Sequence, residues 1–191
     1  MTAFEYVLPL VSVLAGLALA DVAVSLHRLL RARRRVRWDA LPLACAVLAA
    51  LAVLNLWWGL FNSQETPFYQ TLGGFLPLAA LLVVLFLLNA AALPDAVPDE
   101  GMDLRAFYDA NGPYFWSLYA VVVVLSIANN VGGRVALGLS VDVLSYGPNL
   151  VLIALFVALA RFRHRALHGV AVVALLALFL AQWASMSVGA V

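Results

Sequence analysis

The segment GLALADVAVSLHRLLRARRRVRW, residues 16–38, decides the fold of this 191-residue chain. Its first half belongs to an apolar run long enough to cross a bilayer, and its second half is a dense cluster of arginines. That order is typical of a membrane-spanning helix whose basic end lies in the cytoplasm. Asp21 stands inside the apolar run, where an acidic side chain is expensive to bury.

The composition extends this interpretation to the whole chain. Hydrophobic residues make up 65% of the sequence and charged residues only 11%, whereas a soluble domain carries about 25% charged residues. The apolar runs are apolar nearly all round, which favours helices over the alternating strands of a barrel. We therefore predict an all-α, polytopic membrane helix bundle that forms one domain, residues 1–191. The six predicted spans are residues 6–30, 40–61, 71–93, 113–131, 141–162 and 166–188.

Arginine placement predicts the orientation of the spans. The first and fifth connections hold most of the arginines: Arg28, Arg31, Arg33, Arg34, Arg35 and Arg37, then Arg161, Arg163 and Arg165. With six spans, the first, third and fifth connections share one side of the membrane, and Arg105 of the third joins the others there. Because arginine-rich loops stay in the cytoplasm, both termini are expected outside. The same arginines are expected to contact anionic lipid.

The third connection, LPDAVPDEGMDLRAFYDANGP (residues 93–113), is the only long loop. Its prolines and glycine keep the first half irregular. Asp103 is expected to cap a short amphipathic helix at the membrane surface, before Pro113 opens the fourth span. The loop acids either remain solvated or face the arginines of the first and fifth connections. These acids are Asp95, Asp99, Glu100, Asp103 and Asp109.

The stretch SIANNVGGRVALGLSVDVLSYGPN (residues 126–149) departs from the composition of a plain span. Gly132 and Gly133 are expected to loosen the end of the fourth helix. Gly147 and Pro148 are expected to break or kink the fifth. Residues 141–146 then either extend the fifth span beyond a kink or form a short interfacial helix. Broken helices in membranes occur mainly where protein or a watery cavity satisfies the freed backbone groups.

Asp21 is the first candidate for a functional residue. It lies seven residues before Arg28, which places it about 10 Å inside the cytoplasmic edge of its helix. Ser25 and Arg28 share its helix face, and Asn89 of the third span falls at a similar depth. Two interpretations remain open. One is a site that responds to protons or cations, and the other is a structural acid satisfied by Ser25, an arginine or Asn89.

A second polar layer lies in the outer half of the predicted bundle. Its members are Asn55, Asn62, Ser126, Asn129, Asn130, Asp142, Asn149, Gln182 and Ser185. Such side chains either line a wet vestibule or form hydrogen bonds between helices. Four of them stand beside the predicted helix break and are the best candidates for an outward-facing site: Asn129, Asn130, Asp142 and Asn149.

Aromatic residues near the ends of the spans are expected to anchor the protein in the headgroup layers. At the cytoplasmic end these are Trp38, Tyr114, Phe115, Trp116 and Phe162. A haem would need two histidines aimed at one point inside the bundle. His27, His164 and His168 all fall near the inner face, and interfacial positions explain His27 and His164. No cofactor is therefore expected, and this includes a haem held by His27 and His168. No zinc-binding spacing occurs, so no metal site is expected either.

Other features exclude whole classes of chemistry. The absence of lysine excludes a retinal Schiff base and lysine-based covalent catalysis. Cys45 is the only cysteine, so no intrachain disulfide forms, and we expect it to be a small buried filler. No nucleophile–base set or nucleotide-binding glycine loop occurs, which leaves an enzyme without support. The net charge of +1 gives no sign of a nucleic-acid partner.

Three segments carry a resemblance to known proteins: LVSVLAGLALADVAVSLHRLLRARRRVRW, LNLWWGLF and DLRAFYDANGPYF, residues 10–38, 54–61 and 103–115. They are similar to segments of a group of bacterial multi-spanning integral membrane proteins that has no established activity. The resemblance implies a location in the bacterial inner membrane and carries no mechanism.

Two functional hypotheses follow. The first is a small channel or transporter for an ion or small solute, in a homo-oligomer, with Asp21 as the inner ionisable group and residues 129–149 as the outer mouth. The alternative is a membrane module that transports nothing and binds a protein partner or anionic lipid through its basic loops.

Overall fold

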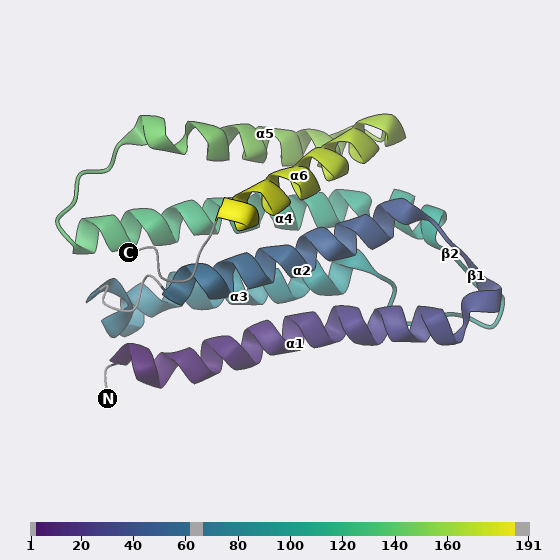
Figure 1. Ribbon diagram of the computed structural model, residues 1–191, viewed down its shortest axis with the longest axis horizontal. Helices are drawn as coiled ribbons and strands as arrows, with labels where there is room; N and C mark the ends of the chain where they lie inside the picture. Colours follow the sequence, from purple (N-terminus) through teal and green to yellow (C-terminus); the bar gives the residue numbers. More distant parts are fainter. Residues whose placement is uncertain (1–2, 62–66, 186–191) are drawn as a thin grey trace.

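The computed structural model describes residues 3–61 and 67–185, which are almost entirely helical (Figure 1). Its long helices are α1 (Ala3–Arg31), α2 (Ala40–Phe61), α3 (Leu72–Ala92), α4 (Leu104–Ala136), α5 (Gly147–Arg161) and α6 (Arg165–Ser185). Six helices in this part of the chain are long and apolar enough to cross a membrane, which confirms the predicted all-α architecture. Residues 186–188 of the predicted sixth span lie outside the described part.

The bundle is organised around α3, which packs against α1, α2 and α4. Buried leucines recur along α3 at helical spacing, among them Leu78, Leu81 and Leu85. The two C-terminal helices join this centre separately, since α5 packs against α4 and α6 packs against α2. Small buried residues of α2 let its neighbours approach closely. One of them is Cys45, whose side chain is 1% exposed, as expected for a buried filler.

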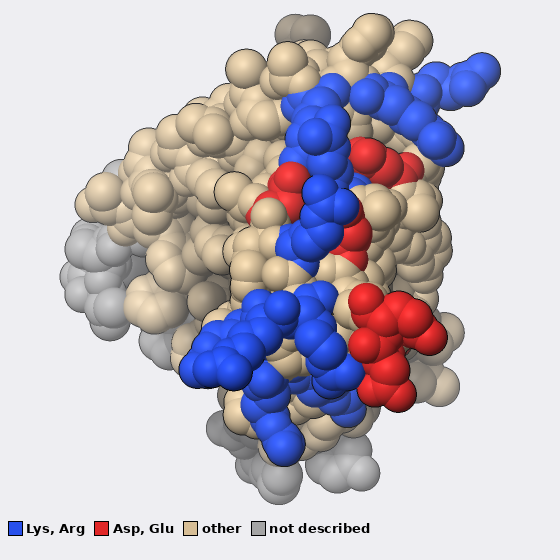
Figure 2. All heavy atoms as spheres, turned by 90° about the vertical axis from the view of Figure 1, so that its right-hand side faces the viewer, with Lys and Arg blue, Asp and Glu red and all other residues tan. Residues whose placement is uncertain are grey.

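The connections at one end of the bundle hold the arginines of α1, of its following loop and of the α5–α6 connection (Figure 2). We call this the arginine-rich end. Here η1 (Arg33–Arg35) leads into β1 (Val36–Arg37), which pairs in parallel with β2 (Met102–Asp103). Gly101 has φ +103°, and a Cβ there would lie 2.5 Å from the carbonyl oxygen of Arg35. Only glycine fits this approach of the two connections.

The fourth span begins earlier than the sequence predicts. Asp103 caps a helix as expected, accepting hydrogen bonds from the backbone N–H groups of Arg105 and Ala106. That helix does not end at Pro113, however, and α4 continues without a break from Leu104 to Ala136. A proline usually clashes with the Cβ of the residue before it. Residue 112 is glycine and has no Cβ, so this clash does not arise here.

The opposite end of the bundle corrects two further expectations. Gly132 does not loosen α4, which stays helical to Ala136. It makes room for Phe68 of η2 (Pro67–Gln70), whose ring would lie 2.4 Å from a Cβ at this position. Gly147 and Pro148 form the first turn of α5 rather than a kink inside it. The preceding residues form the short helical turn η3 (Val143–Tyr146), which runs directly into α5, and the two together are long enough to cross a membrane.

Candidate functional site

Asp21 is half-buried on α1, and its Oδ2 atom is buried without a hydrogen-bond partner among the described residues. The neighbours suggested by the sequence do not satisfy it. Arg28 donates to the backbone carbonyl of Asp95, and Asn89 donates to the carbonyls of Ala49 and Leu85. Ser25 is buried on the same helix, but the structure does not join its hydroxyl to the Asp21 carboxylate. None of these three side chains is therefore hydrogen-bonded to the Asp21 carboxylate in the described part of the chain.

Three of the five loop acids, Asp99, Asp103 and Asp109, pair with arginines, as one of the two alternatives for the third connection predicted. The ion pairs are Arg35 with Asp99 at 3.0 Å, Arg37 with Asp103 at 3.1 Å and Arg165 with Asp109 at 3.8 Å. Arg165 also pairs with Asp39, which precedes α2. These contacts tie the three connections of the arginine-rich end to one another.

Asp103 caps a helix and forms an ion pair at this end. Its carboxylate accepts from the backbone N–H groups that open α4 and lies beside the Arg37 guanidinium. The hydrogen bond from the Ala106 N–H is the main cause that lowers the pKa of Asp103 below its usual value, with the Arg105 N–H and nearby arginines acting in the same direction. The cap therefore stays ionised at neutral pH.

A cavity of about 420 Å³ lies inside the bundle, between α2, α3, α4, α5 and α6. Most of its wall is apolar. Its polar lining residues are Asn55, Tyr69, Tyr119, Ser126, Asn129 and Asn130. No charged side chain belongs to the described wall. The structure thus brings four members of the predicted outer polar layer to one cavity, Asn55, Ser126, Asn129 and Asn130.

Asn129 and Asn130 present hydrogen-bonding groups to this cavity. Asn129 is 5% exposed, and its amide nitrogen donates to the carbonyl of Leu125 at 2.9 Å. Its Oδ1 has no partner among the described residues. A buried acceptor without a partner costs about 1–3 kcal/mol. The oxygen is enclosed in this structure, so a donor in the cavity reaches it after the Asn129 amide turns toward the cavity that the residue lines. The Oδ1 of Asn130 accepts from the Tyr146 hydroxyl at 2.6 Å.

Asp142 and Asn149, the other two candidates beside the predicted helix break, do not line the cavity. Asp142 caps η3 and is exposed, accepting from the backbone N–H of Leu144. Asn149 lies half-buried in the first turn of α5. Asn62 and the side chain of Ser185 lie outside the part that the structure describes. Of the four candidates for an outward-facing site, only Asn129 and Asn130 of α4 therefore line the cavity.

Aromatic rings close the cavity on the side of the arginine-rich end. Tyr119 and Phe156 line its floor, with ring centroids 4.7 Å apart. Trp116 lies beneath them, stacked on Phe156 at 5.6 Å, and is fully buried. The Tyr119 hydroxyl donates to the carbonyl of Leu48 on α2 at 3.0 Å. Trp116 is therefore part of the core, and its predicted role as an interfacial anchor is wrong.

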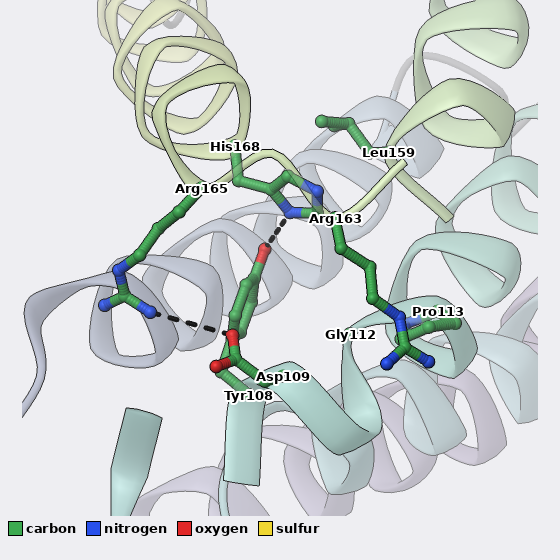
Figure 3. A pocket seen from close by; sticks show the side chains of 8 residues that line it. All are labelled: Tyr108, Asp109, Gly112, Pro113, Leu159, Arg163, Arg165 and His168. Carbon is green, nitrogen blue, oxygen red and sulfur yellow. Dashed lines mark hydrogen bonds and ion pairs between the residues drawn. The ribbon is translucent and has the colours of Figure 1, made fainter. Parts of the chain in front are cut away.

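A chain of hydrogen bonds continues from Trp116 to the α5–α6 connection. The indole N–H of Trp116 donates to the Tyr108 hydroxyl at 2.9 Å, and that hydroxyl lies 2.6 Å from Nδ1 of His168 (Figure 3). The other ring nitrogen of His168 lies 2.7 Å from the carbonyl of Phe162. A neutral imidazole protonated on Nε2 satisfies every contact, since Nδ1 then accepts from Tyr108. Neither ring nitrogen is left to ligate an iron atom.

A second, much smaller hollow of about 20 Å³ lies beside Tyr108 and His168 (Figure 3). Its wall includes Tyr108, Gly112, Leu159, Arg163 and His168. The cavity and this hollow thus lie on opposite sides of one aromatic barrier, which consists of Tyr119, Phe156, Trp116, Tyr108 and His168. We keep the name aromatic barrier for these five residues.

The sequence contained one signal for the barrier that we did not use. Tyr108, Gly112, Trp116 and Tyr119 recur at helical spacing, but only along a helix that continues through Pro113. Ending the amphipathic helix at Pro113 separated Tyr108 from Trp116. His168 gave no such signal, because only the position of α6 brings it to Tyr108.

Comparisons with known proteins found no match of this chain to a family model, to a curated protein or to a solved structure. The site is therefore interpreted from its own geometry. An uncharged cavity, a buried unsatisfied amide oxygen and a closed aromatic floor suit reversible binding of an uncharged molecule.

Proposed function

We propose that this protein is a membrane transporter for a small uncharged molecule, with the bundle cavity as its binding site. The observation that carries the proposal is the unpartnered Oδ1 of Asn129 in a cavity of about 420 Å³. The small hollow beyond the aromatic barrier supports a path that is closed toward the arginine-rich end.

The side chains of the cavity wall favour an uncharged substrate over an ion. An ion would need charged groups or a ring of carbonyl oxygens to replace its hydration shell. The described wall offers amides, hydroxyls and apolar side chains, which suit an uncharged molecule. Asp21 lies on α1, which contributes no residue to this wall, so the transport site that we propose does not include it.

Arginine placement supports an orientation with the arginine-rich end in the cytoplasm and both termini outside. In that orientation the cavity lies in the outer half of the membrane. The resemblance to bacterial membrane proteins supports the bacterial inner membrane as the location. The outward face of α1 supports a homo-oligomer, because Gly16 and Ala20 are exposed there and a Cβ on Gly16 would meet nothing within 4 Å.

Opening the barrier tests whether the cavity belongs to a path through the membrane. Phe156→Ala removes a ring, 1% exposed, that separates the cavity from the residues below it. We expect vesicles containing Phe156→Ala to admit erythritol several-fold faster than vesicles containing the wild-type protein. Stopped-flow light scattering after an osmotic step measures this rate.

Leu155→Ala is the matched control, since Leu155 is the preceding residue of α5 and does not line the cavity. It should leave erythritol entry at the wild-type rate. If Phe156→Ala and the double variant Phe156→Ala/Tyr119→Ala both admit erythritol at the wild-type rate, the cavity is not part of a path across the membrane.

A second function, recruitment of anionic lipid, is favoured by the surface of the arginine-rich end. Arg28, Arg31 and Arg35 surround an open hollow that Asp95 also lines. Arginine side chains cover much of this face (Figure 2). Near a surface of anionic lipid, each basic residue contributes about 1 kcal/mol of attraction.

The lipid function predicts selective retention of anionic lipid. The triple variant Arg31→Gln/Arg33→Gln/Arg34→Gln should retain less phosphatidylglycerol than the wild type in native mass spectrometry, and the difference should shrink in high salt. Arg134→Gln, at the opposite end, should retain the wild-type amount. Equal retention by all three proteins would remove this second function.

A further inference from the structure

The two C-terminal helices leave a seam beside the cavity. α5 and α6 join through a short connection at the arginine-rich end and diverge from it (Figure 1). Each packs against a different partner, α5 against α4 and α6 against α2, and few residues of the two helices lie close together. The seam between them is therefore not sealed by helix packing.

Apolar residues line both sides of this seam. Leu152 and Phe156 of α5 and Leu175 and Phe179 of α6 all contribute to the cavity wall. Leu152 and Phe179 are half-buried, so they lie between the cavity and the outer surface. The surface beyond them is apolar as well, with Val151 68% exposed and Leu178 63% exposed. In a bilayer these helices face lipid chains, and the cavity is reached from there without crossing a polar surface.

The wall also specifies the chemistry of an occupant. Its apolar part, which includes Leu78, Leu81 and Phe156, suits a hydrocarbon body. Among the described residues of the wall, the one buried side-chain atom without a partner is an acceptor, the Oδ1 of Asn129. An occupant that supplies a hydrogen-bond donor would satisfy it once the amide turns toward the cavity. An alcohol or an amide supplies that donor without bringing a charge into the membrane.

We infer that the cavity binds an amphipathic molecule dissolved in the bilayer, which has an apolar body and an uncharged hydroxyl or amide head group that donates to Asn129. The inference rests on the proposed function, because it names the substrate class of the same cavity. The molecule enters between α5 and α6, with its head toward the amides of α4 and its chain toward the aromatic barrier.

Two probes that differ only at the head group test this inference. Thirteen residues of α4, about 20 Å of helix, separate Asn129 from Trp116. An eleven-carbon chain anchored at Asn129 therefore brings a bromine at its far end near the indole of Trp116, where bromine quenches fluorescence. The probes are 11-bromo-1-undecanol, which carries the donor, and 1-bromoundecane, which lacks it. The protein is the full chain in lipid vesicles with Trp38, Trp57, Trp58 and Trp183 replaced by Phe.

We expect saturable quenching by the alcohol and about five-fold weaker binding of the bromoalkane, the effect of one lost hydrogen bond. Asn129→Leu should remove this preference, and the smaller Asn129→Ala should do the same. Asn149→Leu is the matched control outside the cavity and should keep the preference. Because the four tryptophan replacements risk misfolding, a second measurement uses the wild-type tryptophans: the alcohol should raise the Tm more than the bromoalkane does.

Equal binding of the two probes, or a preference that survives in Asn129→Leu, would overturn the inference. So would the absence of both quenching and a shift in Tm. Either result leaves the proposed function standing if Phe156→Ala still admits erythritol. Suppose that vesicles with Phe156→Ala admit erythritol no faster than the wild type while the alcohol binds as expected. The cavity then binds the proposed class of molecule, but the proposed transport function is contradicted.

Discussion

Tyr108→Phe is expected to lower the free energy of unfolding by about 2–3 kcal/mol, because it leaves two buried polar groups without partners. The hydroxyl of Tyr108 accepts from the Trp116 indole and lies within hydrogen-bond distance of Nδ1 of His168. Trp116 is fully buried and His168 is 5% exposed, so water cannot easily replace the lost bonds. The replacement removes one oxygen atom and changes the packing little. Reversible unfolding in mixed micelles measures the loss.

The same helix supplies two controls for this prediction. Tyr119→Phe removes a single hydrogen bond, to the carbonyl of Leu48, and should cost about 1 kcal/mol, within the range measured for such bonds in membrane proteins. Tyr114 is 49% exposed, and Tyr114→Phe should change nothing measurable. If the three variants were equally stable, the bonds of the aromatic barrier would have no special role in holding α4 to α6.

Gly74→Ala is expected to destabilise the opposite end of the bundle by about 3 kcal/mol or more, as severe overpacking does. A Cβ on Gly74 would lie 1.8 Å from the backbone oxygen of Phe68, so η2 would have to move as a whole. Phe68 also covers Gly132 of α4, and a displaced η2 would lose that contact. The Tm of the purified protein and protease cleavage near η2 both report the change.

Its neighbour provides the sharpest control. A Cβ on Gly73 would meet nothing within 4 Å, so Gly73→Ala should be neutral or stabilising by up to about 1 kcal/mol, the difference in helix propensity. Gly132→Ala should fall between the two, because it meets the tip of a movable ring rather than backbone. A Gly73→Ala variant as unstable as Gly74→Ala would mean that the close approach of η2 is not the cause.

Hydrophobic runs predicted the spans well where a helix ends at the edge of an apolar run. The second predicted span, residues 40–61, coincides with α2, and the third differs from α3 by one residue at each end. The fourth prediction was too short at both ends. Pro113 does not stop α4, because Gly112 removes the usual clash and Tyr108 and Trp116 hold the helix together on both sides of the proline.

The candidate site was only partly accessible from the sequence. Amides in an apolar run are conspicuous, so Asn129 and Asn130 were found. The sequence analysis placed Trp116 and the helix that holds Tyr108 at the membrane surface and gave His168 no partner, since nothing in the sequence reports that α4 and α6 meet. Asp21 shows the converse, because its depth in the helix could be predicted from the sequence, but the lack of a hydrogen-bond partner for its Oδ2 atom could not.

The short pairing of Val36 with Met102 separates the helices into two groups that are held together differently. It closes a ring of chain that contains α2 and α3, so the first four helices form one braced scaffold. The last two helices are outside that ring, and at the arginine-rich end two side chains of α6 contact the scaffold: Arg165 pairs with Asp39 and Asp109, and His168 lies within hydrogen-bond distance of Tyr108. Any rocking of α6 against the scaffold therefore has to break the ion pairs of Arg165 and the contact between His168 and Tyr108.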